Sequence, residues 1–195
     1  MAIDPRSFKK VSMADTCSVW NVLSSDRLYR SASSAGCVFC CTAFVNYECL
    51  LKPRKRLYSH DVELQKRLRA ARQTGRFQLF NLEIEDLQEV EILERRRKLG
   101  KGELSSIAFA KRTHQAFLTD DKNALRLALE VLPIGYVQTT PDLFCWLIFE
   151  QFLSDSDKPV VISEHESLKR PLTAQFEASY SLALQFKLAS RGVSN

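Results

Sequence analysis

Short apolar stretches alternate along this chain with segments whose apolar residues recur at helical spacing. Five stretches have the composition of β-strands: residues 8–14, 37–41, 76–82, 115–118 and 134–138. Between them lie apolar stripes typical of helices, for example Ile84, Leu87, Val90 and Leu93. Such alternation predicts parallel strands joined by right-handed crossovers, with helices on both faces. We therefore expect an α/β fold of three layers, α/β/α, around a mainly parallel sheet of about five strands.

The chain after residue 153 has a different pattern. Residues 154–159 (SDSDKP) predict a polar linker, and residues 160–162 predict a short edge strand. Beyond them an apolar residue recurs every four positions, which predicts an amphipathic helix: Leu172, Phe176, Tyr180, Leu184 and Leu188. The sequence thus predicts a domain over residues 8–153 and a C-terminal extension over residues 154–195. The apolar stripe must be buried, either against its own domain or against a partner or a second copy.

Composition limits the class of protein. A length of 195 residues favours one domain with additions, and a hydrophobic content of 45% is enough for a core. No apolar run reaches the roughly 18–20 residues that a membrane span needs. The N-terminus also lacks the apolar segment of a signal peptide. We therefore expect a cytoplasmic protein with no membrane partner.

The six cysteines are expected to be reduced. Cys37 and Cys40 form a CxxC pair, but no second pair completes a zinc ribbon. Both lie in an apolar run, where free cysteine behaves as a small hydrophobic residue. We expect thiols in the core and a reducing cytosol around the protein.

The net charge of +5 is compatible with a phosphate-bearing partner but does not establish one. Basic residues cluster within residues 52–56, 67–72 and 95–101. Solvated helix faces are the alternative explanation of these clusters. From them we select Lys52, Arg54 and Lys101 as candidates for binding a nucleic-acid backbone.

Acidic residues follow two of the predicted strands. Asp15 comes after the first strand, and Asp120 and Asp121 come after the fourth. In open parallel sheets, ligands bind beyond the carboxyl ends of strands where the strand order reverses. Two further acids lie in helical contexts, Glu48 beside apolar residues and Glu103 at a helix start after a Gly-Lys-Gly loop.

Carboxylates gathered from separate elements repel one another unless a cation lies between them. Mg²⁺ prefers oxygen ligands, and a bound metal can activate water for attack on phosphorus. Each acid also has an ordinary explanation: Asp15 can end a strand, Asp121 can cap a helix, and Glu103 suits a first helical turn. Their joint placement is what favours a metal site.

Residues 99–140 (LGKGELSSIAFAKRTHQAFLTDDKNALRLALEVLPIGYVQTT) carry a family resemblance. They resemble the PIN-domain family in having a glycine and an acid at a helix start, an alanine-rich helix, a strand ending in Thr-x-Asp, a helix and a last strand. The stretch DTCSVWNVL, beginning at Asp15, resembles the first motif of the family. The resemblance covers about residues 8–153 and is closest to prokaryotic PIN proteins related to type II toxins.

The resemblance implies a Mg²⁺- or Mn²⁺-dependent nuclease, usually a ribonuclease. Four residues match the catalytic, metal-binding acids of the family: Asp15, Glu48, Glu103 and Asp121. Asp120 is the alternative to Asp121, and Asp142 is a weaker candidate. Thr16 and Thr119 match small polar residues beside the site.

The expected substrate is nucleic acid, RNA above all. The toxin half of a toxin–antitoxin pair is one form of this expectation, with an antitoxin protein and a homodimer as possible partners. Two alternatives stay open: a PIN-like binding or scaffolding module without catalysis, and a DNA nuclease in a repair or defence system.

Overall fold

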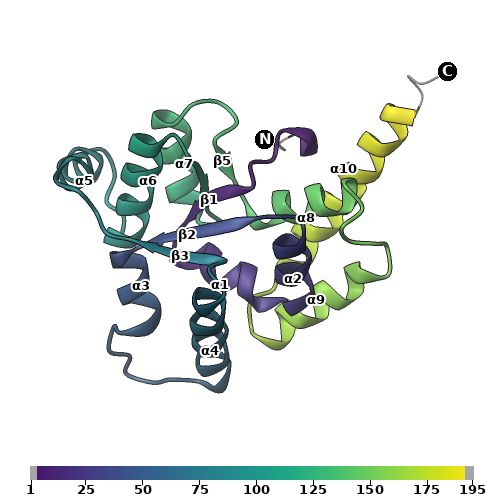
Figure 1. Ribbon diagram of the computed structural model, residues 1–195, viewed down its shortest axis with the longest axis horizontal. Helices are drawn as coiled ribbons and strands as arrows, with labels where there is room; N and C mark the ends of the chain where they lie inside the picture. Colours follow the sequence, from purple (N-terminus) through teal and green to yellow (C-terminus); the bar gives the residue numbers. More distant parts are fainter. Residues whose placement is uncertain (1–3, 192–195) are drawn as a thin grey trace.

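The computed structural model describes residues 4–191, and Figure 1 shows a central sheet with helices on both sides. The sheet has the order β3-β2-β1-β4-β5 and every pairing is parallel. Its strands are β1 (Val11–Ala14), β2 (Val38–Thr42), β3 (Phe77–Phe80), β4 (Ala116–Leu118) and β5 (Val137–Gln138). The prediction of an α/β fold is confirmed: five parallel strands form the central layer of a three-layer α/β/α arrangement.

Alternate residues of each strand face opposite layers. In β1, Met13 contributes to the core cluster under α5 (Ile84–Arg96), α6 (Lys101–Thr113) and α7 (Lys122–Val131). The next residue, Ala14, contributes to the core on the other face. That second layer contains α1 (Thr16–Ser24), α2 (Asp26–Ser34), α4 (Ser59–Gln73) and α8 (Thr140–Phe149). Both faces of the sheet are therefore covered, as continuous apolar strands require.

Strand ends differ from the sequence prediction where an apolar residue lacks a pairing strand. Phe8 lies after a short 3-10 helix, η1 (Pro5–Ser7), and stacks on Trp146 with ring centroids 5.1 Å apart. Ile134 is fully exposed, and β5 begins only at Val137. An apolar residue is expected to be buried or to lie in a strand. It joins the sheet, however, only where its backbone pairs with a neighbouring strand.

The five cysteines Cys37, Cys40, Cys41, Cys49 and Cys145 are buried and Cys17 is half-buried, all as free thiols. Burial raises the pKa of Cys37 to about 12. The prediction that the CxxC pair lies in the core is confirmed.

The predicted edge strand at residues 160–162 is wrong, because these residues lie inside α9 (Asp157–Ser167). The predicted linker also ends early, since α9 begins at Asp157. Pro159 falls in the first turn of the helix, where its missing N–H is not needed. Val161 is fully buried against the core, and this packing outweighs the strand preference of Val160, Val161 and Ile162.

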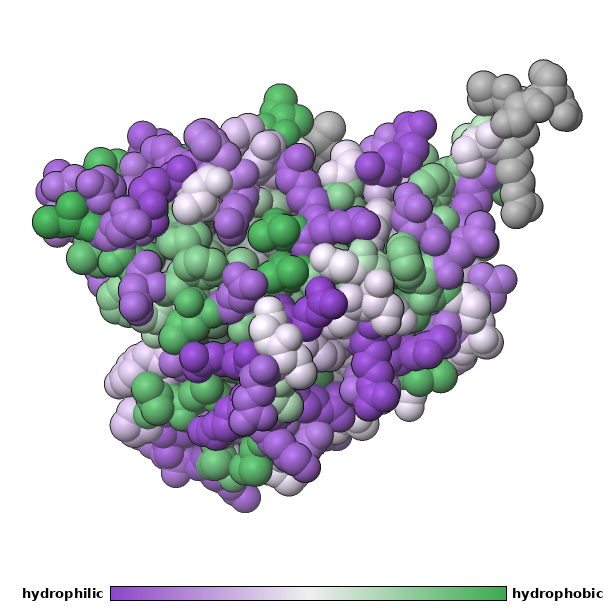
Figure 2. Space-filling view, in the orientation of Figure 1, coloured by the Kyte–Doolittle hydropathy of each residue, from purple (hydrophilic) through white to green (hydrophobic). Residues whose placement is uncertain are grey.

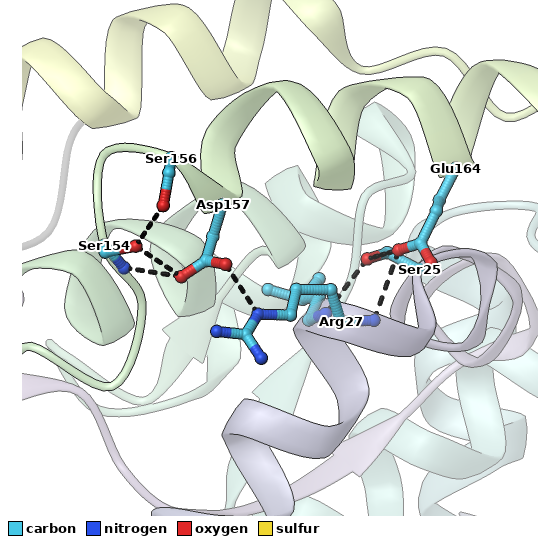
Figure 3. A network of polar contacts seen from close by, with 7 residues as sticks. Ser25, Arg27, Ser154, Ser156, Asp157 and Glu164 are labelled. Atoms are coloured by element: carbon cyan, nitrogen blue, oxygen red, sulfur yellow. Dashed lines mark hydrogen bonds and ion pairs between the residues drawn. The ribbon is translucent and has the colours of Figure 1, made fainter.

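Polar contacts fix α9 to the start of α2 (Figure 3). The Arg27 Nε–H donates to Asp157 Oδ1 at 2.7 Å, and the Ser25 hydroxyl donates to Glu164 Oε2 at 2.5 Å. The Ser154 amide and hydroxyl donate to Asp157 Oδ2 at 2.8 and 2.7 Å. The hydrogen bond from Arg27 lowers the pKa of Asp157 to about 2. These bonds orient the C-terminal segment on the domain.

The C-terminal helix is confirmed as α10 (Thr173–Arg191), and it packs on α8 of its own chain. Phe176 is fully buried, and its ring lies 5.0 Å from that of Phe144. Leu188, however, is 69% exposed. A four-residue step turns a helix by roughly 40° more than one full turn, so a stripe with that spacing drifts off the buried face. Within residues 4–191, no helix combines the length and apolarity needed to cross a membrane.

Candidate functional site

Asp15 connects the end of β1 to the start of α1 and is fully buried. Its Oδ1 accepts the Ser18 N–H at 2.8 Å, which caps the helix, and its Oδ2 accepts the Thr119 hydroxyl at 2.5 Å. Burial raises the pKa of Asp15 to about 7, opposed by these hydrogen bonds and assisted by the neighbouring charge of Asp120. A cation beside Asp15 would favour its ionised form.

Asp120 follows β4 and is held by two helices of the opposite layer. Its Oδ2 accepts the Asn21 side-chain amide at 2.8 Å and the Thr140 hydroxyl at 2.6 Å, and its Oδ1 accepts the Thr140 N–H at 2.9 Å. Burial raises the pKa of Asp120, although these hydrogen bonds oppose the rise. Because β1 and β4 are neighbours, Asp15 and Asp120 bring two carboxyls to the same edge of the sheet.

Asp121 takes a different role. Its Oδ1 accepts the N–H groups of Asn123 and Ala124, both at 2.8 Å, and so caps α7. The sequence favoured Asp121 over Asp120 as the fourth acid. In the structure Asp15 accepts the Ser18 N–H and Asp120 accepts the Ser18 hydroxyl at 3.5 Å, whereas Asp121 lies near enough to Glu103 to raise its pKa.

Glu48 lies on α3 (Ala43–Leu50) and turns towards the starts of α1 and α6. Its Oε2 accepts the Thr16 hydroxyl at 2.5 Å. A methyl group at Gly102 would overlap this oxygen and approach Thr16 Oγ1 to 3.2 Å. The missing side chain of Gly102 therefore leaves room for the Glu48 carboxylate beside the starts of α1 and α6.

Glu103 occupies the first turn of α6. Its Oε2 is buried and has no hydrogen-bond partner among the described residues. Burial raises the pKa of Glu103, opposed by hydrogen bonds from the backbone of Glu103 and Gly100 and assisted by the charges of Glu48 and Asp121. An unsatisfied buried oxygen calls for an explanation such as a bound ion or water.

Asp142 stabilises the start of α8. Its Oδ2 accepts the Thr139 N–H at 2.9 Å and the Thr139 hydroxyl at 2.7 Å, which completes a capping box. This geometry gives Asp142 a structural role in positioning Thr140, which in turn holds Asp120.

Asp15 and Asp120 both contact Ser18, and Glu48 and Asp121 both lie near enough to Glu103 to raise its pKa. Burial raises the pKa of Cys17, and the charges of Asp15, Asp120 and Asp121 add to the rise, so these acids are not sharply separated. Across residues 4–191, no three Asp, Glu, His or Cys side chains lie close enough to enclose a metal ion. Mg²⁺, however, is usually held by one or two carboxylates and keeps several waters. The carboxylate oxygens of Asp15 and Asp120 are donors of the kind that a hydrated Mg²⁺ prefers, and each already accepts a hydrogen bond from the chain.

Sequence reasoning named Thr119 and Thr16, which donate to Asp15 and Glu48. It missed Asn21 and Thr140, which hold Asp120. Asn21 is buried in an otherwise apolar part of α1, between Trp20 and Val22. A lone amide in such a run needs a partner, and that signal was available in the sequence. The role of Thr140 was not, because it depends on β5 lying next to β4.

An open groove adjoins Glu48. Its lining residues come from α3, the following turn and the start of α6: Ala43, Phe44, Tyr47, Glu48, Lys52, Gly100 and Lys101. Lys101 pairs with exposed Glu94 at 2.7 Å. Arg54 pairs with Asp61 at 2.7 Å and is not among the lining residues. Of the three basic candidates, Lys52 and Lys101 flank the acids.

Comparison with protein-family models, with curated proteins and with solved structures found no match to this chain.

Proposed function

We propose that this chain is a PIN-like nuclease that uses Mg²⁺ or Mn²⁺ to hydrolyse phosphodiester bonds, with RNA as the preferred substrate. One observation carries the proposal. Asp15 and Asp120 follow β1 and β4, the two strands between which the order β3-β2-β1-β4-β5 reverses direction. This is the position where open parallel sheets bind ligands.

In this proposal Asp15 and Asp120 would hold the cation, with water completing its shell. When bound, the cation polarises the scissile phosphate and lowers the pKa of a water. Thr119 and the Ser18 N–H fix the Asp15 carboxylate. Asn21 and Thr140 fix that of Asp120 in the same way. Both carboxylates are thus oriented before substrate binds.

Metal-dependent cleavage of single-stranded RNA and of DNA of the same sequence tests the proposal. Asp15→Asn and Asp120→Asn should each abolish cleavage, because each removes a ligand charge while nearly preserving shape. Glu91→Gln makes a comparable change at an exposed position of α5 and should leave cleavage intact. Failure of the parent protein to cut any substrate with Mg²⁺ or Mn²⁺ would refute the proposal. DNA cleaved as fast as RNA would support the DNA-nuclease form instead.

A binding module without catalysis is the second candidate. It is supported by the hydrogen bonds that both oxygens of Asp15 and both oxygens of Asp120 already accept from the chain. Tight RNA binding without cleavage in any divalent cation would favour it.

The toxin form of the proposal rests on the resemblance carried by residues 99–140. It predicts an antitoxin protein as partner, with a homodimer as a further possibility. Arrest of growth on induced synthesis of the parent protein, absent for Asp15→Asn, would support it.

A further inference from the structure

The outward face of α3 is unusual for a helix at the surface of a domain. Val45 and Cys49, four residues apart, are fully buried. On another side of the helix, Phe44, Tyr47, Glu48 and Leu51 follow the spacing i, i+3, i+4 and i+7 and form a second stripe. Two of these are aromatic, and Tyr47 is 47% exposed. Polar residues would be expected on such a face.

Three residues of this stripe, Phe44, Tyr47 and Glu48, line the groove. Gly100, Lys101 and Lys52 line it as well. Figure 2 shows apolar side chains interrupted by hydrophilic ones towards the α3 end of the molecule. The groove thus combines aromatic surface with basic side chains and ends at a carboxylate of the candidate site.

The positive charges of Lys52 and Lys101 indicate which class of ligand the groove would bind. The Lys52 ammonium forms no ion pair within residues 4–191. Lys101 pairs with Glu94, but both side chains are about half-exposed. Such surface ion pairs contribute little to stability. Both lysines are therefore available to phosphate. A nucleotide matches the rings and the lysines, because it offers a flat apolar base for the aromatic rings and an anionic backbone for the lysines.

We propose that this groove is a base-stacking subsite, in which Tyr47, supported by Phe44, stacks on one unpaired nucleobase next to the scissile phosphate. The proposal rests on the nuclease function proposed above and adds a requirement to it. A base within a duplex cannot reach the ring, so the nucleotide at this position must be unpaired. Lys52 and Lys101 bind the flanking phosphates and hold the strand across Glu48.

Binding without divalent cations tests the subsite separately from cleavage. The probe is a short single-stranded RNA carrying one 2-aminopurine, whose fluorescence falls when it stacks. Stacking on an aromatic side chain contributes about 1–3 kcal/mol per base, so Tyr47→Ala should weaken binding by roughly 5- to 150-fold. Tyr47→Phe keeps the ring and should bind within about threefold of the parent, at well under 1 kcal/mol. Fluorescence quenching should be lost only in Tyr47→Ala.

Tyr136→Ala is the matched control. Tyr136 directly precedes β5, at the opposite edge of the sheet from the acids. Equal affinity and equal quenching for Tyr47→Ala and the parent would overturn the subsite while leaving the nuclease proposal intact. No RNA binding by the parent would also overturn the subsite, whereas the nuclease proposal fails only if the parent cuts no substrate with Mg²⁺ or Mn²⁺. Tyr47→Ala should weaken the binding of single-stranded RNA but not that of fully paired RNA. Equal losses of affinity for the two RNAs would also overturn the subsite, because a base within a duplex cannot stack on the ring.

Discussion

At the residue scale, the candidate site depends on which oxygen each carboxylate presents and on what holds it. The sequence predicted that Asp15 and the acids after the fourth strand would meet, and the pairing of β1 with β4 places them at the same edge of the sheet. It left Asp120 open as the alternative to Asp121 and gave helix capping as the ordinary explanation of Asp121; in the structure Asp121 caps α7, and Asp120 shares Ser18 with Asp15. The backbone conformation just after the three-residue strand β4 decides where the Asp120 and Asp121 carboxylates lie. The residues next to them in the sequence do not determine that conformation.

Substitution of Gly102 tests whether this position leaves room for the Glu48 side chain. In Gly102→Ala, the new methyl displaces Glu48 and costs its hydrogen bond to Thr16, about 1 kcal/mol. Alanine gains about 1 kcal/mol over glycine within a helix, so stability should change little. In a Glu48→Ala background the carboxylate is absent, and Thr16 Oγ1, at 3.2 Å, needs to move only slightly. The same change should then raise the free energy of unfolding by up to about 1 kcal/mol. Urea unfolding of the parent, the two single variants and the double variant measures this coupling. Equal effects of Gly102→Ala with and without Glu48 would contradict a close contact between residue 102 and the Glu48 side chain.

At the element scale, strand and helix types were predicted well wherever the apolar pattern was regular. The five strands were found to within a few residues, whereas residues 160–162 were misassigned. Three β-branched or aliphatic residues cannot distinguish a strand from a buried turn of helix. The docking of α9 through Arg27 and Asp157 settles the question, and this contact joins residues 130 positions apart.

The packing of α10 gives a prediction with an internal control. Phe176→Ala removes a fully buried ring in contact with Phe144 and His165, and should lower the free energy of unfolding by about 3–5 kcal/mol. Leu188→Ala, on the same helix but exposed, should change it by less than about 0.5 kcal/mol. Chemical denaturation compares the two, and similar losses would mean that α10 does not pack as described.

His165 makes the docking of α10 sensitive to acid. Its Nδ1 lies 3.1 Å from the Arg170 carbonyl, and its Nε2 is buried without a partner among the described residues. Burial lowers the pKa of His165 to about 4, although the contact with Arg170 opposes this. The unfolded chain therefore binds the proton more readily, and stability is lost as the pH falls from about 6.5 to 4.

Replacing the imidazole should flatten this dependence. The loss attributable to His165 is at most about 3 kcal/mol over that range. His165→Leu carries no titrating group, so the difference in free energy of unfolding between parent and variant should shift towards the variant as the pH falls. Urea unfolding at pH 7 and pH 4.5 measures it. A constant difference between the two proteins would show that His165 does not titrate in this way.

At the scale of the whole molecule, the strand order creates the site. Alternation of strands and helices predicted parallel pairing, but not the order β3-β2-β1-β4-β5. That order puts β1 and β4 together and brings Asn21 and Thr140 from two helices onto Asp120. Both facts arise from packing between segments far apart in the chain, so a single sequence does not determine them by local pattern.

The central claim is that Asp15 and Asp120 hold a divalent cation. The most direct test is a crystal structure of the parent protein grown with Mn²⁺, in which anomalous scattering locates the metal. The account predicts a peak at the ends of β1 and β4, with carboxylate oxygens of Asp15 and Asp120 about 2.1 Å away and water completing the shell. Asp15→Asn should lose the peak under the same conditions. A parent crystal with no peak there at millimolar Mn²⁺, or with one bound only by Glu48 and Glu103, would contradict it.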